Sequence, residues 1–154
     1  MTRKRKNVKH DPSFSPGSKS PKIEASVNPD AFWDESPSWC FKYADRKHDR
    51  WRITCDTIDE TFIDNLIDRE RQKWNQILTS TSGKSKGTRN HQIQTNEICK
   101  DAQKRLKELK LDHEDVLYSI RIKSRYRWWG VIRRGVFYFI WSDLNHEICP
   151  TADP

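Results

Sequence analysis

Hydrophobic and polar positions alternate most clearly in the C-terminal stretch 117–150. Residues 118–123 alternate between apolar and polar, which predicts a strand with one buried and one solvent-facing side. The run 126–132 is almost entirely apolar on both parities, as expected of a central strand. Gly135 then allows a turn with positive φ, and residues 136–141 predict another strand. The stretch therefore predicts an antiparallel meander of three strands.

Two earlier stretches repeat apolar residues at helical spacing. One helix is predicted over about 57–79, where Thr57 and Glu60 have the spacing of a capping box, and another over about 95–110. The aromatic stretch 39–54 predicts one long strand or a hairpin. The inward positions of the two helices are Ile58, Phe62, Ile63, Leu66, Ile67, Trp74, Ile77 and Leu78, and then Ile98, Ala102, Leu106 and Leu109.

These elements follow the order β-α-α-β-β-β and predict an α+β fold. We expect an antiparallel helical hairpin on one face of an antiparallel sheet of about four strands, because two amphipathic helices and a one-sided sheet have only each other to cover. Trp74 and Leu78 would then lie in one core with Ala102, Leu106 and Ile120.

The N-terminal residues differ in composition from the rest of the chain. Residues 1–30 are rich in Pro, Ser and Lys, so we expect a disordered basic tail before a single domain over 31–154. The run Arg3 to Lys6 is read as an electrostatic arm for phosphates, as an import signal if the host has a nucleus, or as a solvated tail.

Charge favours a polyanionic partner. The 154-residue chain has a formal net charge of +7, which points to nucleic acid first. Lys84, Lys86 and Arg89 lie in the Gly- and Ser-rich stretch 79–90, which we read as a flexible loop that either contacts phosphate or only connects the helices.

The four cysteines do not predict a metal site. Cys40, Cys55, Cys99 and Cys149 lie far apart with no histidine at ligand spacing, so we expect no metal and no other cofactor. No apolar run approaches the roughly 20 residues that span a bilayer, and the N-terminus lacks the apolar core of a signal peptide. We expect a cytoplasmic protein with reduced thiols and no membrane partner.

Cations are dense in the predicted sheet. Residues 116–142 contain no acidic residue and include Arg121, Lys123, Arg125, Arg127, Arg133 and Arg134. Guanidinium groups bind phosphate and neutralise the charge that grows when a phosphodiester is cleaved. The alternative is the ordinary polar side of a one-sided sheet. Tyr126, Trp128 and Trp129 either stack on bases or belong to the core.

His146 follows the last predicted strand and lies between Asp143 and Glu147. Histidine titrates near neutral pH and can remove the ribose 2′-OH proton or protonate the leaving oxygen. A neighbouring carboxylate would orient the ring and raise its pKa. The alternative is a surface hydrogen-bonding group.

Several of these features occur together in one known superfamily. Lys104-Arg105-Leu106 in a helix, the strand 117–122 with sequence LYSIRI, Tyr126-Arg127, and a last strand that ends at an acidic residue and His146 resemble the RelE/ParE toxins, especially the HigB-like and YoeB-like ribonucleases. The resemblance covers about residues 57–150. The chain is longer than most such toxins, and Glu147 stands where some members have a tyrosine.

The resemblance implies a metal-independent endoribonuclease that acts on mRNA, free or ribosome-bound, with a small antitoxin protein as partner. It implies His146 as general acid or base, Arg121 and Arg127 as phosphate and transition-state contacts, and Tyr126 as a stacking or secondary proton-transfer group. Two alternatives remain: a non-enzymatic module on the same fold that binds nucleic acid or protein, and a structural domain whose basic face has no specific role.

Overall fold

The computed structural model describes residues 32–80 and 90–150. The predicted tail 1–30 and most of the predicted loop 79–90 lie outside the described residues. The elements within these ranges are β1 (Ser38–Cys40), α1 (Glu60–Glu70), α2 (Trp74–Thr79), β2 (His91–Gln94), α3 (Lys100–Glu108), β3 (Val116–Lys123), β4 (Tyr126–Arg133) and β5 (Val136–Asp143).

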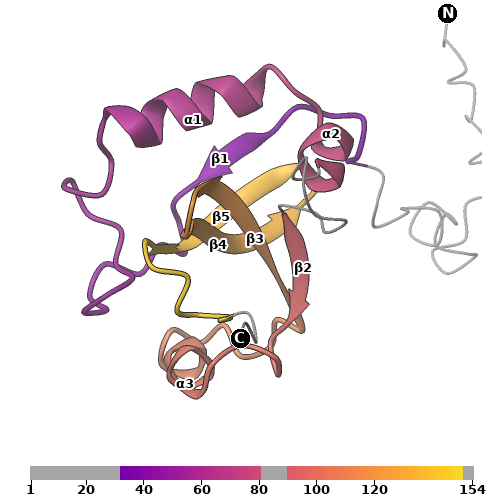
Figure 1. Ribbon diagram of the computed structural model, residues 1–154. Helices are drawn as coiled ribbons and strands as arrows, with labels where there is room; N and C mark the ends of the chain where they lie inside the picture. The colour runs from indigo at the N-terminus through magenta and orange to yellow at the C-terminus, as the bar shows by residue number, and fades with distance from the viewer. Residues whose placement is uncertain (1–31, 81–89, 151–154) are drawn as a thin grey trace, which may run out of the picture.

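The strands form one mixed sheet in the order β1-β5-β4-β3-β2 (Figure 1). The predicted meander β3-β4-β5 is confirmed, and β4 lies at its centre. The prediction of about four antiparallel strands is corrected, because the described sheet has five strands and β1 runs parallel to β5. The short strand β2 was not predicted, since Ile93 is the one apolar residue among its four. The fold class is α+β, as predicted.

Helices cover both faces of the sheet. Figure 1 shows α1 and α2 on one side and α3 on the other, so the predicted helical hairpin on one face is wrong. The physical reason lies in β4, whose neighbours Trp128 and Trp129 point to opposite faces and are both fully buried. Each face therefore needs its own helical cover.

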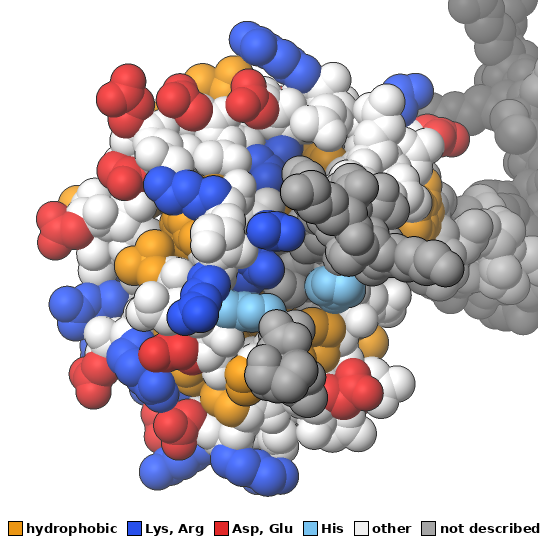
Figure 2. Space-filling view, viewed as in Figure 1, with side chains coloured by type: hydrophobic (Ala, Val, Ile, Leu, Met, Phe, Trp, Pro, Cys, Tyr) orange, Lys and Arg blue, Asp and Glu red, His pale blue; other side chains and the backbone are white. Residues whose placement is uncertain are grey.

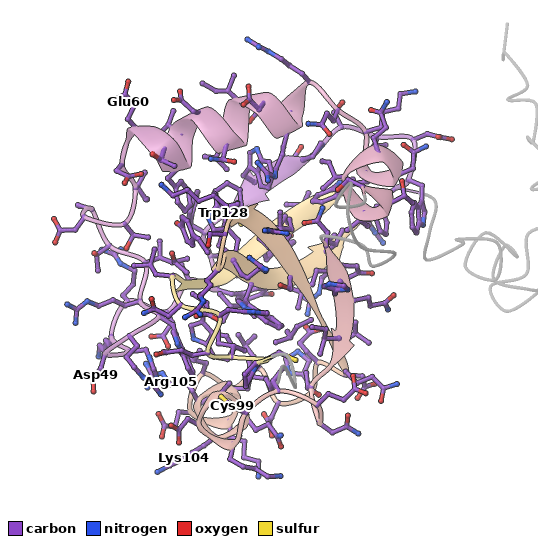
Figure 3. All side chains as sticks on the ribbon, in the orientation of Figure 1. Asp49, Glu60, Cys99, Lys104, Arg105 and Trp128 are labelled. Carbon is purple, nitrogen blue, oxygen red and sulfur yellow. The ribbon has the colours of Figure 1, made fainter. Side chains whose placement is uncertain are left out.

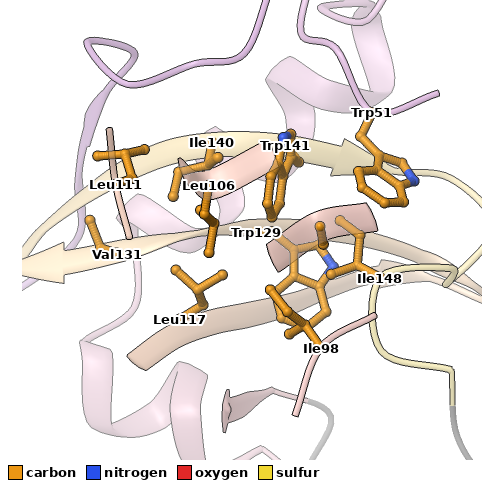
Figure 4. Close-up of a cluster of buried hydrophobic side chains, with 11 residues drawn as sticks. Trp51, Ile98, Leu106, Leu111, Leu117, Trp129, Val131, Ile140, Trp141 and Ile148 are labelled. Carbon is orange, nitrogen blue, oxygen red and sulfur yellow. The ribbon is translucent and has the colours of Figure 1, made fainter. Parts of the chain in front are cut away.

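Two separate hydrophobic clusters replace the single predicted core. Trp74 and Ile120 belong to the cluster beneath α1 and α2, whereas Ala102 and Leu106 belong to the cluster beneath α3. Figure 4 shows the α3-side cluster. Its buried members are Trp51, Ile98, Ala102, Leu106, Leu111, Leu117, Trp129, Val131, Ile140, Trp141 and Ile148.

The predicted helix 57–79 is broken into α1 and α2. The α1 helix begins after Asp59, whose carboxylate accepts the Phe62 N–H at 2.9 Å. At the start of α2, the Trp74 N–H donates to the Glu35 carbonyl at 2.9 Å, so the polypeptide before β1 satisfies a donor that a continuous helix would satisfy itself. Ile63 is 45% exposed, because the apolar stripe is wider than the face that α1 buries.

The aromatic stretch 39–54 does not form the predicted long strand or hairpin. The only strand in it is β1, and residues 41–59 are turns and irregular backbone that lie beside β5. The Asp45 N–H donates to the Ile140 carbonyl at 2.9 Å, and the Trp51 carbonyl accepts the Ser142 N–H at 3.0 Å. The stretch is thus attached to the sheet without β geometry.

Asp45 fixes this irregular segment to α3. Its buried carboxylate accepts Arg105 Nε at 2.7 Å, Arg105 Nη2 at 2.8 Å and Trp141 Nε1 at 3.0 Å. Burial by itself would raise the pKa of Asp45, but these hydrogen bonds outweigh it and lower the pKa from 3.8 to about 2. In Figure 3, Arg105 lies on the α3 side of the sheet and Trp128 on the α1 side.

Candidate active site

Charged side chains meet on three adjacent strands. Arg121 on β3 lies opposite Arg127 on β4, which in turn lies opposite Asp143 on β5. Arg127 has the parity of Trp129, whose side chain packs in the α3-side cluster. The three residues therefore occupy the α3-facing side of the sheet, at the end where β3 turns into β4.

Arg127 is a buried cation. It is 9% exposed, and its Nη1 donates to the carbonyls of Ser124 at 2.7 Å and Tyr126 at 3.1 Å. Among the described residues, Arg127 forms no ion pair with a carboxylate. Burial lowers the pKa of Arg127, and the charge of Arg121 lowers it further, while Asp143 acts in the opposite direction.

His146 is held in a tight turn after β5. Its φ of 58° is in the left-handed region, which few non-glycine residues adopt. The Asp143 carboxylate closes the turn by accepting the N–H groups of Glu147 at 2.9 Å and Ile148 at 3.0 Å. The Glu147 carboxylate instead accepts Arg50 Nη1 and Trp51 Nε1, both at 3.2 Å. The neighbouring acids therefore shape the turn and its attachment.

The pKa of His146 shifts in the direction opposite to the prediction. Burial lowers it from 6.5, and the charges of Arg127, His91 and Arg121 lower it further, while the charge of Asp143 raises it in part. The neutral imidazole is thus the main form at pH 7, and a neutral imidazole can accept a proton.

His91 is a fourth basic group at this place, and sequence reasoning missed it. It lies at the start of β2 opposite Ser119, and its charge acts on the pKa of His146. Burial and then the charge of Arg127 lower the pKa of His91. The available sequence signal was its position beside the basic segment that ends at Arg89.

We call His91, Arg121, Arg127 and His146 the His/Arg cluster. Figure 2 shows two histidine side chains in the middle of one face with Lys and Arg side chains around them. The charges of Arg127, His91 and Arg121 all lower the pKa of His146, so these three groups lie within electrostatic range of His146, and the charge of Arg121 also lowers the pKa of Arg127. Two imidazoles and two guanidinium groups supply two proton carriers and two fixed positive charges.

Tyr126 lies away from this cluster. Its side chain belongs to the core beneath α1 and α2, and its hydroxyl accepts Ser142 Oγ at 3.0 Å and Trp128 Nε1 at 3.1 Å. Burial raises the pKa of Tyr126. The structure therefore places Tyr126 on the face opposite Arg127, consistent with their adjacent positions in one strand.

The other predicted phosphate contacts divide into three groups. Lys123 and Arg125 are exposed at the turn between β3 and β4, at the same end of the sheet as Arg127. Arg133 and Arg134 lie at the far end of β4, where Arg133 pairs with Glu114 and donates to the Tyr43 hydroxyl at 3.0 Å. These two are not brought to the cluster. Lys84, Lys86 and Arg89 lie outside the described residues.

Within residues 32–80 and 90–150, no three His, Cys, Asp or Glu side chains are grouped so that they could hold a metal ion. The four cysteines are free thiols. No helix in the described part of the chain has the length and apolar character needed to cross a membrane. Comparison with known proteins finds no matching family model, no matching curated protein and no matching solved structure.

Proposed function

We propose that the protein is an endoribonuclease that works without a metal ion and cleaves RNA at the His/Arg cluster. The observation that carries the proposal is that His91 and His146 lie within electrostatic range of each other and of Arg127, which is buried without a carboxylate partner among the described residues. The RelE/ParE-like interpretation of the sequence agrees with this chemistry. In that interpretation mRNA, free or on the ribosome, is the substrate.

The reaction is an internal transfer at phosphorus. The ribose 2′-oxygen attacks the adjacent phosphorus, so that a 2′-O–P bond forms while the P–O5′ bond breaks. His146, neutral at pH 7, accepts the 2′-OH proton. Burial and the charge of Arg127 lower the pKa of His91 in the free protein, and a bound negative phosphodiester raises it, so that His91 in its protonated form donates a proton to the departing 5′-oxygen. The products are a 2′,3′-cyclic phosphate and a 5′-hydroxyl, and all protons are accounted for.

The two arginines stabilise the charge that develops on the non-bridging phosphate oxygens. Arg127 is fixed by its bonds to two carbonyls, so its guanidinium needs little reorganisation when the substrate binds. Arg121 lies directly opposite it on β3. Two like charges held side by side repel each other, and an anion between them relieves that repulsion.

The test is cleavage of a labelled RNA in EDTA, with analysis of the product ends. We expect a cyclic or 3′-phosphate together with a 5′-hydroxyl. His146→Ala should lower the rate by roughly 10²- to 10⁴-fold, and His91→Ala should have an effect of the same order. The rate should decline on the acid side below pH 6.5, because His146 must be neutral to accept a proton.

Lys104→Ala provides a matched control, because this exposed cation belongs to α3 and not to the His/Arg cluster. Its cleavage rate should equal that of the unmodified protein. Cleavage that needs a divalent ion, leaves a 5′-phosphate or survives both histidine substitutions contradicts the mechanism. RNA binding without cleavage would instead favour the non-enzymatic binding module.

The toxin interpretation has its own test in cells. Induced expression should slow growth, a small antitoxin protein should restore it, and His146→Ala should remove the growth defect. Growth arrest that persists in His146→Ala would favour action by binding, to nucleic acid or to another protein.

A further inference from the structure

A cavity lies at the edge of β3, where it shares Arg121 with the His/Arg cluster. β2 pairs with β3 only as far as Ser119, and beyond this point the Arg121 N–H donates to Asn90 Oδ1 at 2.8 Å. The cavity has a volume of about 430 Å³. Its lining includes Arg69, Gln72, Ser80, Asn90, Arg121 and Lys123.

Arg69 gives this cavity a partly buried positive charge. Its Nη1 donates to the carbonyl and to Oδ1 of Asn65 at 3.2 and 2.6 Å, and its Nη2 donates to the Arg121 carbonyl at 2.7 Å. The guanidinium also lies over the Trp128 ring, 5.5 Å from its centroid. All three acceptors are neutral, and a guanidinium has five N–H donors, so donor capacity remains for an anion.

Arg69 forms no ion pair with a carboxylate of the described residues. Burial lowers its pKa, and the nearby charge of Asp68, which also lines the cavity, offsets only part of this effect. A desolvated cation beside open space, without a paired carboxylate, is costly unless an anion binds.

Among the described residues that line the cavity, Asp68 is the one acid, against the three cations Arg69, Arg121 and Lys123. Lys123 is exposed and adds another positive charge from β3. The local balance therefore favours an anion.

We infer that this cavity binds a phosphate group of the same RNA strand whose neighbouring phosphate is cleaved at the His/Arg cluster. The inference rests on the proposed function, because Arg121 belongs both to the cluster and to the lining of the cavity. Arg69 and Lys123 bind the phosphate, and Arg121 belongs to both subsites, because its main chain borders the cavity and its side chain lies in the His/Arg cluster. The cavity thereby selects a polynucleotide over a single nucleotide.

The experiment measures binding of a labelled 2′-O-methyl RNA decamer, which has no free 2′-OH at its linkages and is not cleaved, at several salt concentrations. Arg69→Gln should weaken binding by about 10-fold or more, as for a lost hydrogen bond to a charged group. The slope of log affinity against log salt should fall by about 0.7, the value for one phosphate contact in a single strand. Lys123→Gln, an exposed position, should change the slope in the same direction.

Arg71→Gln is the matched control, since this exposed arginine lies two residues from Arg69 and outside the cavity lining. Thermal melting of each variant checks that it is folded. If Arg69→Gln fails to fold, Lys123→Gln decides the result. RNA binding by the two cavity variants that matches the control at every salt concentration overturns the inference, and so does a protein that does not bind the decamer.

Thermal melting with inorganic phosphate and RNA cleavage by the same variants separate the possible outcomes. Inorganic phosphate could raise the melting temperature of the unmodified protein but not that of Arg69→Gln, while both bind RNA equally well. That result overturns the assignment to an RNA strand. Arg69-dependent RNA binding in a protein that cleaves no RNA supports the phosphate subsite and contradicts the endoribonuclease. Cleavage that depends on His146, together with RNA binding that Arg69→Gln and Lys123→Gln leave unchanged, supports the endoribonuclease and overturns the phosphate subsite.

Discussion

Arg105 and Arg127, both on the α3 side of the sheet, have opposite electrostatic surroundings. Arg105 forms a two-point ion pair with the buried Asp45 carboxylate, and the hydrogen bonds to Asp45 raise its pKa. Arg127 lies between Arg121 and Asp143, whose carboxylate is already used by backbone N–H groups, and burial lowers its pKa. The charged form of Arg105 is therefore stabilised, whereas the charged form of Arg127 is disfavoured.

The difference separates a structural cation from a candidate functional one. A paired and hydrogen-bonded charge connects elements of the fold, whereas a buried charge without a partner reduces stability unless a ligand supplies the opposite charge. The same criterion identifies Arg69, which sequence reasoning did not select.

Asp45→Ala should have the largest effect on stability. Its loss leaves Arg105 with only the exposed Glu108 carboxylate and leaves Trp141 Nε1 buried without an acceptor, which should lower the free energy of unfolding by about 3 kcal/mol. Urea unfolding measures the change. Asp49→Ala is the control, because Asp49 is exposed in the same segment and its removal should cost less than about 0.5 kcal/mol. Equal stability of the two variants would contradict a structural role for the Asp45–Arg105 pair.

Acid should remove the contribution of Asp45. Because its pKa is lowered from 3.8 to about 2 in the folded protein, the carboxylate contributes stability above pH 3.8, and this is lost as the pH falls through 2. The difference corresponds to about 2 kcal/mol. Unfolding of the unmodified protein and of Asp45→Asn between pH 5 and 2 should show a flatter profile in the variant. Parallel profiles would mean that Asp45 is not responsible.

Arg121→Gln should have the smallest effect and the opposite sign. Removing one of two cations that face each other across β3 and β4 should raise the free energy of unfolding by up to about 1 kcal/mol. RNA cleavage should fall in the same variant. Arg125→Gln, at an exposed turn position, should leave stability nearly unchanged. A destabilised Arg121→Gln would place Arg121 among the structural cations.

The His/Arg cluster was predictable in part. His146, Arg121 and Arg127 were selected because strand periodicity and a histidine at a strand end are local patterns. His91 was missed because it is 55 positions before His146 and meets it only through the pairing of β2 with β3. The predicted direction of the His146 pKa shift was also wrong. The acids that neighbour His146 in sequence bind backbone N–H groups and Arg50, and their charge does not outweigh the burial of the ring and the cations near it.

The sequence by itself determined the meander, the turn at Gly135 and the inward faces of α3, because alternation, positive φ and helical spacing are properties of consecutive residues. Only the tertiary structure decided that the helices lie on opposite faces. The adjacent tryptophans of β4 require cover on both sides, but the sequence does not state which helix covers which side. The tertiary structure also decided which arginines have a carboxylate partner, because Asp45 and Arg105 are 60 positions apart in sequence. Burial and pairing are set by contacts between distant segments, and the charges they leave without a partner mark the candidate site.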